Sequence, residues 1–401
     1  MTENIEVKLS QLLNSLSYAL DIAENRYYGH SRRTAYIAYN IGEEMGLKHQ
    51  DLMDIYYAAL IHDIGMAGHL SNYSVMDIHY KENLLKEHCS FGYKILKNLP
   101  LKPEISEYIL YHHEEWDGSG PFGLKGDETP LASQIIHLAD YFELFFVRKT
   151  NFGTDTYEID VFNKWLKRHK NTMFNENICH GILNLMKKEK FWLDLQSKNI
   201  NSVLNLIEPK EDIVLDIHGL HSISEAFSLL IDAKSKFTYE HSKGVSNYAS
   251  SFAQYLGYDE IMVEKLTIAA NLHDIGKFIV PLEILEKPKK LNSMEFLTMK
   301  SHVYYTKLIL KQIEGLEDIA EWAGNHHEKL NGKGYPERLD ENSLTKEDQI
   351  IAFADIYQAL IEDRPYRKGM APKKAIDIMK NMANKGYICN RMLGDFKQLV
   401  L

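Results

Sequence analysis

The feature that most constrains this chain is a set of histidines and aspartates that is written twice. Each residue of the first half lies 211, 214 or 215 positions before its counterpart in the second half. Such matched spacing indicates an internal duplication, and the repeated residue types indicate a metal site. The second-half set is His241, His273, Asp274, His302, His326, His327 and Asp355. The first-half set is His30, His62, Asp63, His88, His112, His113 and Asp140.

The length of the chain supports two domains. Its 401 residues exceed what one hydrophobic core usually serves. We predict a first domain over residues 1–205, a connection over 206–225 and a second domain over 226–401. Apolar residues at helical spacing predict a helix whose stripe faces a core, with a homodimer interface as the alternative. The stripe consists of Ile5, Leu9, Leu12, Leu16 and Leu20.

An all-α fold is the expected class, with two tandem helical domains. Long alternating strand patterns and the glycine motifs of Rossmann and P-loop folds are absent from the sequence. Glycine and proline gather in three stretches, which we expect to be loops. In the second half, Asn292 and Glu295 have the spacing of a capping box, which predicts the start of a helix that carries His302. The three loops are residues 117–130, 331–339 and 362–372.

Charge and cysteine content restrict the partners and the compartment. A net charge of −10 argues against binding to long nucleic acid or to anionic membrane, although it permits a small phosphate ligand. The three cysteines, Cys89, Cys179 and Cys389, are scattered and suit reduced thiols. No secretory signal and no apolar stretch of membrane-spanning length is visible. We therefore expect a cytoplasmic protein without membrane contact.

The second-half set offers five imidazoles and two carboxylates, which is enough for two metal ions. Because a carboxylate can bridge two cations, Asp274 is the expected link between them. His273 and Asp274 are expected on one helix, diverging by about 100°. Mixed nitrogen and oxygen ligation favours iron or manganese over a closed thiolate zinc site. Two metals about 4 Å apart would acidify a bridging water and stabilise an in-line attack at phosphorus.

The motifs around these ligands resemble the HD-GYP family, the branch of the HD phosphohydrolases that hydrolyses bacterial cyclic dinucleotides. The resemblance runs from about residue 232 to 400 and rests on HDIGK (273–277), VPLEILEKPKKL (from 280), HHEKLNGKGYP (326–336), ADIYQAL (354–360) and DRPYR (363–367). It implies a helical fold and a di-iron or related centre. One metal would lie among His241, His273, Asp274 and Asp355. The other would lie among Asp274, His302, His326 and His327.

The same resemblance implies the roles of further residues. Asp274 and Lys277 would be catalytic, with Lys277 on the scissile phosphate. Arg364 and Arg367 would hold the phosphates, and Tyr335 would line the nucleotide pocket. Two departures stand out: Asn331 replaces the usual Asp of the loop, and Phe237 lies where some members carry a glutamate that supports a third metal. We therefore predict two metals in this half.

The first copy resembles the family more weakly, over about residues 15–200. It keeps all seven ligand types, which makes a second metal site possible, but Met66 replaces the lysine of HDIGK. Its loop at 117–124 has no tyrosine, and only Arg148 and Lys149 follow Asp140 closely. Three interpretations compete: a metal-binding regulator or brace, a hydrolase of another phosphoester, or a metal site without function. We favour a degenerate regulatory or structural copy, although retention of every ligand argues against an inert scaffold.

Together these observations favour a metal-dependent phosphodiesterase. Its substrate would be cyclic di-GMP or 3′3′-cyclic GMP-AMP, and its product a linear dinucleotide, with mononucleotides after a second turnover. One alternative is another HD-type nucleotide phosphohydrolase. Another is a nucleotide-sensing regulator that binds without cleaving. The sequence alone does not decide between the two cyclic dinucleotides, and it does not identify the metal.

Overall fold

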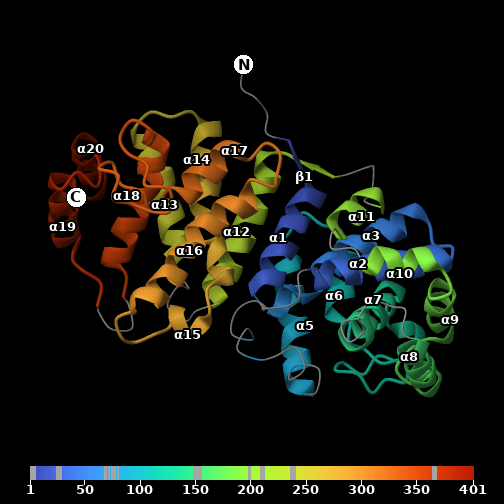
Figure 1. The fold of residues 1–401 in the computed structure, drawn as a ribbon. Helices are drawn as coiled ribbons and strands as arrows, with labels where there is room; N and C mark the ends of the chain where they lie inside the picture. The colour runs from blue at the N-terminus through green and yellow to red at the C-terminus, as the bar shows by residue number, and fades with distance from the viewer. Residues whose placement is uncertain are drawn as a thin grey trace. The chain divides into compact units, whose positions relative to one another are not determined.

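The computed structural model describes residues 6–23, 29–66, 70, 73, 78, 81–147, 156–196, 200–207, 213–234, 241–363 and 368–401. The described chain is almost entirely helical, as the sequence predicts (Figure 1). Its two named strands, β1 (Val7–Lys8) and β2 (Val214–Leu215), have two residues each and pair antiparallel. None of the described helices is long and apolar enough to cross a membrane.

The chain forms two compact units, and each contains one copy of the histidine set. One unit comprises residues 16–66 and 70–212, and the other comprises residues 213–401 together with the first 15 residues. The start of the chain groups with the second unit because Val7 pairs with Leu215. The second unit also contains a helix that begins at Ile217, inside the range expected to be a connection. Asp216 starts this helix, since its side chain accepts a hydrogen bond from the Gly219 N–H at 2.9 Å.

The first unit is built from helices of 8 to 15 residues with shorter helical turns between them. Helix α1 leads into it, and Leu9, Leu12, Leu16 and Leu20 are all buried, which confirms a core-facing stripe; Ile5 lies outside the described residues. Helix α1 (Leu9–Ala23) belongs to this unit from Leu16 onward. The other elements are α2 (His30–Glu44), α3 (His49–Leu60), η1 (His62–Met66), α5 (Glu82–Leu96), α6 (Pro103–Leu110), η3 (Gly126–Glu128), α7 (Leu131–Phe142), η4 (Glu143–Val147), α8 (Thr156–His169), α9 (Glu176–Leu185), α10 (Glu189–Gln196) and α11 (Ile200–Ile207).

The second unit repeats the central arrangement of the first. Helix α13 packs against α14 and α18, just as α2 packs against α3 and α7. The turn η5 packs on α16 as η1 packs on α5. The elements are α12 (Ile217–Lys234), α13 (His241–Tyr255), α14 (Glu260–Leu272), η5 (Ile275–Ile279), α15 (Leu282–Leu285), α16 (Ser293–Leu310), α17 (Glu317–Gly324), α18 (Lys346–Ile361), α19 (Pro372–Asn384) and α20 (Asn390–Val400).

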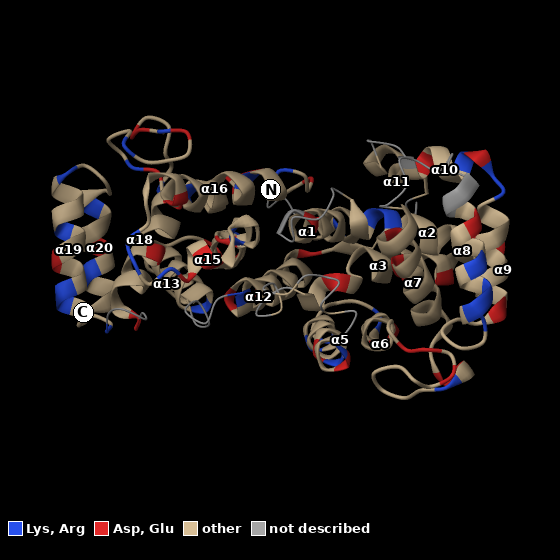
Figure 2. Ribbon diagram, turned by 60° about the horizontal axis from the view of Figure 1, so that its bottom comes forward, with Lys and Arg blue, Asp and Glu red and all other residues tan. Residues whose placement is uncertain are grey.

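Local sequence signals account for several of these boundaries. The predicted capping box at the start of α16 is confirmed: the Asn292 side chain accepts from the Glu295 N–H, and the Glu295 side chain accepts from the Asn292 N–H. The three glycine- and proline-rich stretches lie outside the α-helices wherever they are described, except for Pro372, which begins α19. Basic and acidic residues are interspersed along outer helices such as α10 and α19 (Figure 2).

Candidate metal centre and active site

The His-Asp pair of the second unit lies where two helical elements meet. His273 follows the last residue of α14 and Asp274 precedes η5, so the expectation that both lie on one helix is wrong. The physical reason is the close packing of η5 on α16. A Cβ atom on Gly276 would lie well inside contact distance of the His302 carbonyl oxygen, so only glycine permits this approach. The tight turn directs both side chains toward one centre.

One side of this centre is formed by two histidines and two carboxylates. The Nε2 atom of His241 lies 3.2 Å from Asp355 Oδ1 and 3.9 Å from Asp274 Oδ2. The Nε2 atom of His273 lies 3.0 Å from the same Asp274 oxygen. His241, His273 and Asp355 offer ligand atoms within 4.8 Å of one another. The four residues that the resemblance assigns to one metal are therefore brought together.

The other side is formed by three histidines and the second oxygen of the same aspartate. Asp274 Oδ1 lies 3.4 Å from His302 Nε2. The ligand atoms of His302, His326 and His327 lie within 4.8 Å of one another. Asp274 thus presents one carboxylate oxygen to each side, which is the geometry that a bridging ligand needs. All seven second-unit residues of the sequence prediction converge on this centre.

Hydrogen bonds fix the orientation of three imidazoles. The Nδ1 atoms of His273, His302 and His326 lie 2.6, 2.6 and 2.7 Å from the carbonyl oxygens three residues earlier. Each Nδ1 carries the proton, because it must donate to a carbonyl, and each Nε2 lone pair then faces the centre. The Nε2 atoms of His273 and His302 are buried and make no hydrogen bond within the described part of the chain. Buried acceptors left open around a carboxylate fit bound metal ions.

The titration behaviour of the centre fits the same conclusion. Burial lowers the pKa of His302 to about 3, and it also lowers the pKa of His326 well below its usual range. Burial alone would raise the pKa of Asp274, but neighbouring His273 and Lys277 hold it well below the ordinary value. His241 differs: burial opposes its protonation, yet hydrogen bonds to Asp355 and Glu362 raise its pKa to about 9. Metal binding would displace that proton.

The first unit repeats this geometry with its own residues. Asp63 Oδ2 lies 3.2 Å from His30 Nε2 and 3.1 Å from His62 Nε2, whereas Asp63 Oδ1 lies 3.5 Å from His88 Nε2. Asp140 lies 3.2 Å from His30 Nε2. Asp63 therefore has the same bridging position as Asp274. The first-unit set also comes together in full, because His112 and His113 complete the side that contains His88.

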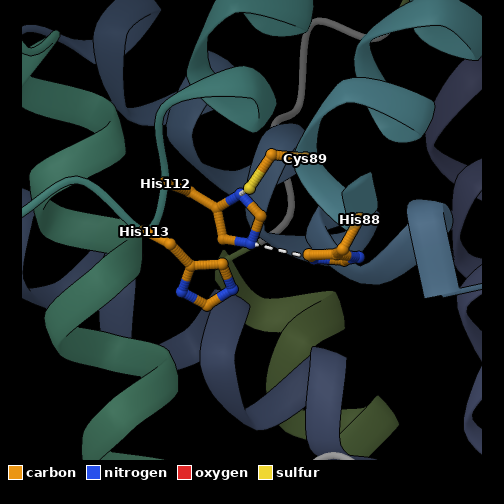
Figure 3. A group of neighbouring side chains, drawn as sticks. All are labelled: His88, Cys89, His112 and His113. Carbon is orange, nitrogen blue, oxygen red and sulfur yellow. Dashed lines mark hydrogen bonds between the residues drawn. The ribbon is translucent and has the colours of Figure 1, made fainter. Parts of the chain in front are cut away.

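The side that contains His88 has a thiol next to it (Figure 3). His88 Nε2 lies 3.3 Å from His112 Nε2, and Cys89 Sγ lies 3.9 Å from His112 Nδ1. The sulfur therefore lies near one ring nitrogen of His112 and His88 lies near the other. The His112 Nδ1 also donates to the Ile109 carbonyl oxygen at 2.7 Å. Burial raises the pKa of the Cys89 thiol well above its usual value. The repeat places buried Val303 at the matching position, so Cys89 fills a core position beside the centre.

The comparisons with known proteins agree with this duplicated site. Two models described as HD domain match residues 27–144 and 225–388. The 3′3′-cGAMP-specific phosphodiesterase 1 of Vibrio cholerae is 31% identical over 96% of this chain and 90% of its own length. The 3′3′-cGAMP-specific phosphodiesterase 3 of V. cholerae is 28% identical over 93% of this chain and 90% of its own length. A crystal structure of a cyclic GMP-AMP specific phosphodiesterase of V. cholerae matches with a TM-score of 0.69 at 26% identity, covering 98% of both chains.

This chain belongs to the HD-GYP family. The resemblance found in the sequence is thereby confirmed, including the tandem arrangement of two HD domains. A cyclic di-GMP phosphodiesterase of Thermotoga maritima is also similar, at 32% identity, but over only 42% of this chain and 46% of its own length. The two 3′3′-cGAMP-specific phosphodiesterases, in contrast, are similar along almost the whole chain.

The loop that gives the HD-GYP family its name is anchored by the glutamate after the paired histidines. Glu328 accepts hydrogen bonds from the N–H groups of Glu337, Arg338 and Leu339 at 2.7, 3.0 and 3.1 Å. Gly334 passes so close to Glu328 that a Cβ atom would overlap its backbone. The loop is thereby held against the metal centre, and the Tyr335 ring lies 5.0 Å from the His327 ring.

The remaining predicted residues of the HD-GYP site have mixed outcomes. Lys277 forms an ion pair with Asp274 and is 19% exposed, so its ammonium borders the centre. Asn331 donates to the Lys385 carbonyl oxygen at 2.8 Å, which ties the loop to the segment between α19 and α20. The other predicted residues, Arg364, Arg367, Phe237, Arg148 and Lys149, lie outside the described residues.

Several residues of the site were missed by sequence reasoning. Glu362 accepts from His241 Nδ1, with oxygens 3.1 and 3.2 Å away, and Glu143 does the same for His30. Lys234 is buried and donates to the carbonyl oxygens of Lys277 and Phe278, which lie within η5. The repeat itself could have revealed another pair: Asp21 and Asp232 both lie nine residues before the first histidine and bond the serine after it.

The first copy departs from the second in what surrounds its ligands. Met66, in place of Lys277, is buried in an apolar cluster with Leu70 and Ile78. The loop of the first copy is anchored in the same way as that of the second, since Glu114 accepts hydrogen bonds from the N–H groups of Phe122 and Leu124 at 2.6 and 2.7 Å. The two copies thus share the cage and the loop anchor. At the position of Met66 and Lys277, however, only the second copy has an ammonium group beside the centre.

Proposed function

We propose that this chain is a metal-dependent phosphodiesterase that hydrolyses 3′3′-cyclic GMP-AMP, with catalysis in the second unit. The observation that carries the proposal is the position of Asp274, which offers an oxygen to each histidine group while it holds the Lys277 ammonium. Two relatives whose names specify 3′3′-cGAMP align along almost the whole chain, whereas the cyclic di-GMP relative of T. maritima aligns over less than half. This favours the mixed dinucleotide over cyclic di-GMP.

We further propose two divalent metal ions, iron or manganese, in the second unit. His241, His273, Asp274 and Asp355 would hold one, and Asp274, His302, His326 and His327 the other. Nitrogen and carboxylate donors suit these metals. When bound, the metals would activate water and stabilise the charge that develops on the phosphate. The cell compartment that fits this activity and the buried free thiols of Cys89 and Cys179 is the cytoplasm.

The chain's own residues prepare the centre for this chemistry. The carbonyl contacts at Nδ1 hold three imidazoles in one tautomer, so no reorientation is needed when charge develops. The Lys277 ammonium would bind a nonbridging oxygen of the scissile phosphate, and Arg364 and Arg367 would hold the phosphates. Tyr335 would line the nucleotide pocket. Hydrolysis would break one phosphodiester P–O bond, release the 3′-oxygen and give a linear dinucleotide, and a second turnover would give mononucleotides.

We assign the first unit a regulatory or structural role. Its cage is retained, but the position of the phosphate-binding lysine is taken by Met66, whose side chain is buried among apolar groups. Two further functions remain as rivals: hydrolysis of other nucleotides, and binding without cleavage. A panel of nucleotides would distinguish the first, and tight binding without product would reveal the second.

The decisive experiment measures hydrolysis of 3′3′-cyclic GMP-AMP and cyclic di-GMP with iron or manganese supplied. Wild type is compared with His62→Ala/Asp63→Ala and with His273→Ala/Asp274→Ala. We expect only the second variant to lose activity, by about a thousandfold or more, because metal ions supply several kcal/mol of transition-state stabilisation. Circular dichroism checks that both variants fold. Equal loss in both variants would contradict the division of labour, and faster cleavage of cyclic di-GMP would contradict the choice of substrate.

A further inference from the structure

Among the described ligands of the second unit, His327 has the side chain most exposed to solvent. The His327 side chain is 31% exposed, whereas those of His241, His273 and His302 are exposed by 4%, 0% and 2%. Among the described ligands, His327 therefore marks the most accessible side for an approaching substrate. The side chains that lie outward from His327 become candidates for contact with the part of the substrate that does not react.

Two aromatic rings and a lysine continue outward from this opening. The Tyr335 ring lies 5.0 Å from the His327 ring and 6.5 Å from the Phe296 ring. The Lys300 ammonium lies 4.6 Å from the centre of the Phe296 ring and 5.4 Å from that of Tyr335. Phe296 and Lys300 are one turn apart near the start of α16, the helix that also carries His302. Phe296 is 46% exposed.

Exposure of one phenylalanine is not unusual, because folded proteins expose much apolar surface. Met294, Leu297 and Tyr304 on the same helix are exposed as well. Phe296 differs from Met294 and Leu297 in its position, because it is held beside Tyr335 by a shared cation–π contact with Lys300. This contact restricts the ring to one place next to the opening and leaves nearly half of the side chain accessible.

The internal repeat isolates Phe296 as the residue that differs. Lys86 matches Lys300 at the 214-residue offset, and its ammonium lies 5.2 Å from the centre of the Phe122 ring in the loop of the first unit. The cation and the loop aromatic are thus present in both units. At the position of Phe296, however, the first unit has Glu82, which is exposed. A carboxylate there offers no stacking surface and repels phosphate.

We infer that Phe296, Lys300 and Tyr335 form a subsite that stacks one purine of the dinucleotide and attracts its non-scissile phosphate. The inference rests on the proposed function, because it assumes that a nucleotide phosphate lies at the metal centre. A purine has a π-face that fits the exposed Phe296 ring, and the ammonium between the two rings supplies the positive charge. Since these contacts form in the ground state, they lower KM more than they raise kcat.

The test compares Phe296→Ala and Phe296→Tyr with Met294→Ala, an exposed control on the same helix. We expect Phe296→Ala to raise KM for 3′3′-cyclic GMP-AMP by about 10- to 100-fold, since base stacking commonly contributes this much. kcat should change little, Phe296→Tyr should restore most of the affinity, and Met294→Ala should match wild type. If wild type hydrolyses the substrate and Phe296→Ala has the same KM as wild type, the subsite is refuted while the proposed function stands.

A second readout does not depend on hydrolysis. A cyclic dinucleotide that contains 2-aminopurine should lose fluorescence when its base stacks on wild type, and this quenching should disappear in Phe296→Ala but persist in Met294→Ala. If wild type fails to hydrolyse any cyclic dinucleotide, the proposed function falls, while quenching still supports a base-binding subsite. Equal quenching in wild type and Phe296→Ala would overturn the inference whatever the activity.

Discussion

In both units one aspartate divides its two carboxylate oxygens between two groups of histidines. Asp63 and Asp274 lie at nearly the same distances from the second histidine, 3.1 and 3.0 Å, and from the third, 3.5 and 3.4 Å, whereas the first histidine is 3.2 Å from Asp63 and 3.9 Å from Asp274. The first histidine of each set is held by a glutamate, Glu143 or Glu362. The units differ around this cage, where Lys277 is matched by Met66 and Phe296 by Glu82.

This contrast teaches that the cage and the substrate contacts respond to different constraints. Apart from the partly exposed His327, the ligands of both cages are buried, so losing one of them would leave other polar groups buried without a partner. The substrate contacts border solvent and can change at little cost to folding. In the second unit, Lys234 supports η5 by donating to the Lys277 carbonyl oxygen. The matching residue of the first unit is Ala23, which has no ammonium, just as Met66 stands in place of Lys277.

The exchange of the lysine and the methionine tests this contrast most strongly. We expect Lys277→Met to lower kcat/KM for 3′3′-cyclic GMP-AMP by about 100-fold or more, because a preorganised charge at the phosphate is lost. Metal content, measured by mass spectrometry, should stay the same, since no predicted ligand is removed. Activity within threefold of wild type would show that Lys277 only neutralises Asp274.

The reverse change, Met66→Lys, should give no activity and should lower stability. The new ammonium would lie among Leu70 and Ile78, where burial of a charge costs several kcal/mol unless it is paired. The assay is made in the His273→Ala/Asp274→Ala background, so that any activity must come from the first unit. Thermal unfolding gives the stability change, with Met66→Leu as the apolar control. Hydrolysis by this protein would show that one residue separates the two copies.

The duplicated ligand set, the helix start at Asn292 and the all-α class could be predicted from the sequence, because each depends on local signals. Ligand spacing survives duplication because each ligand sits at a fixed point of a helix or turn, and Asn292 with Glu295 marks a helix start through purely local hydrogen bonds. The all-α class follows from periodicity that each segment displays by itself. These signals lie within short stretches, so no knowledge of packing is needed.

Other features depend on contacts between distant residues. The His273–Asp274 turn ends its helix because Gly276 packs on His302, 26 residues away. Residues 6–15 join the second unit because Val7 pairs with Leu215. The supporting glutamates share no spacing, since Glu143 follows Asp140 by three residues and Glu362 follows Asp355 by seven. Aligning the two halves could not reveal this equivalence.

The supporting glutamates offer a second test of intermediate size. Glu362→Gln should weaken metal binding to the second unit by about 10-fold or more, because a carboxylate that accepts from a ligating histidine raises its basicity. Affinity is measured by competition with a chelator in the His62→Ala/Asp63→Ala background. Unchanged affinity would mean that Glu362 does not polarise His241.

The matched change, Glu143→Gln, should act mainly on stability. Glu143 is fully buried and also pairs with Arg33, at 2.8 and 2.5 Å from Nε and Nη2. Its neutralisation removes the charge of one partner of that guanidinium, which is 14% exposed. We expect a larger drop in melting temperature for Glu143→Gln than for Glu362→Gln. The reverse order would show that the two glutamates are not equivalent supports.

The smallest expected effect concerns Asp232, whose carboxylate accepts from the Ser242 hydroxyl at 2.7 Å. Burial raises the pKa of Asp232 to about 6, although Ser242 and His241 oppose the shift. A folded-state pKa above the unfolded value means that the folded protein binds the proton more tightly. Stability is therefore lost as the pH rises from about 4 to 6, by at most about 3 kcal/mol at 1.36 kcal/mol per pKa unit.

Asn imitates the protonated carboxyl group, so Asp232→Asn should gain stability relative to wild type as the pH rises from about 4 to about 6. The measurement is the difference in melting temperature of the metal-free proteins across this range. Asp21→Asn is the matched control in the first unit. Asp21 accepts from the Gly29 N–H at 3.0 Å and from the Ser31 N–H at 3.3 Å, so an amide there would place N–H groups against N–H groups. That variant should be less stable than wild type throughout, and a constant difference for Asp232→Asn would place its ionisation outside this range.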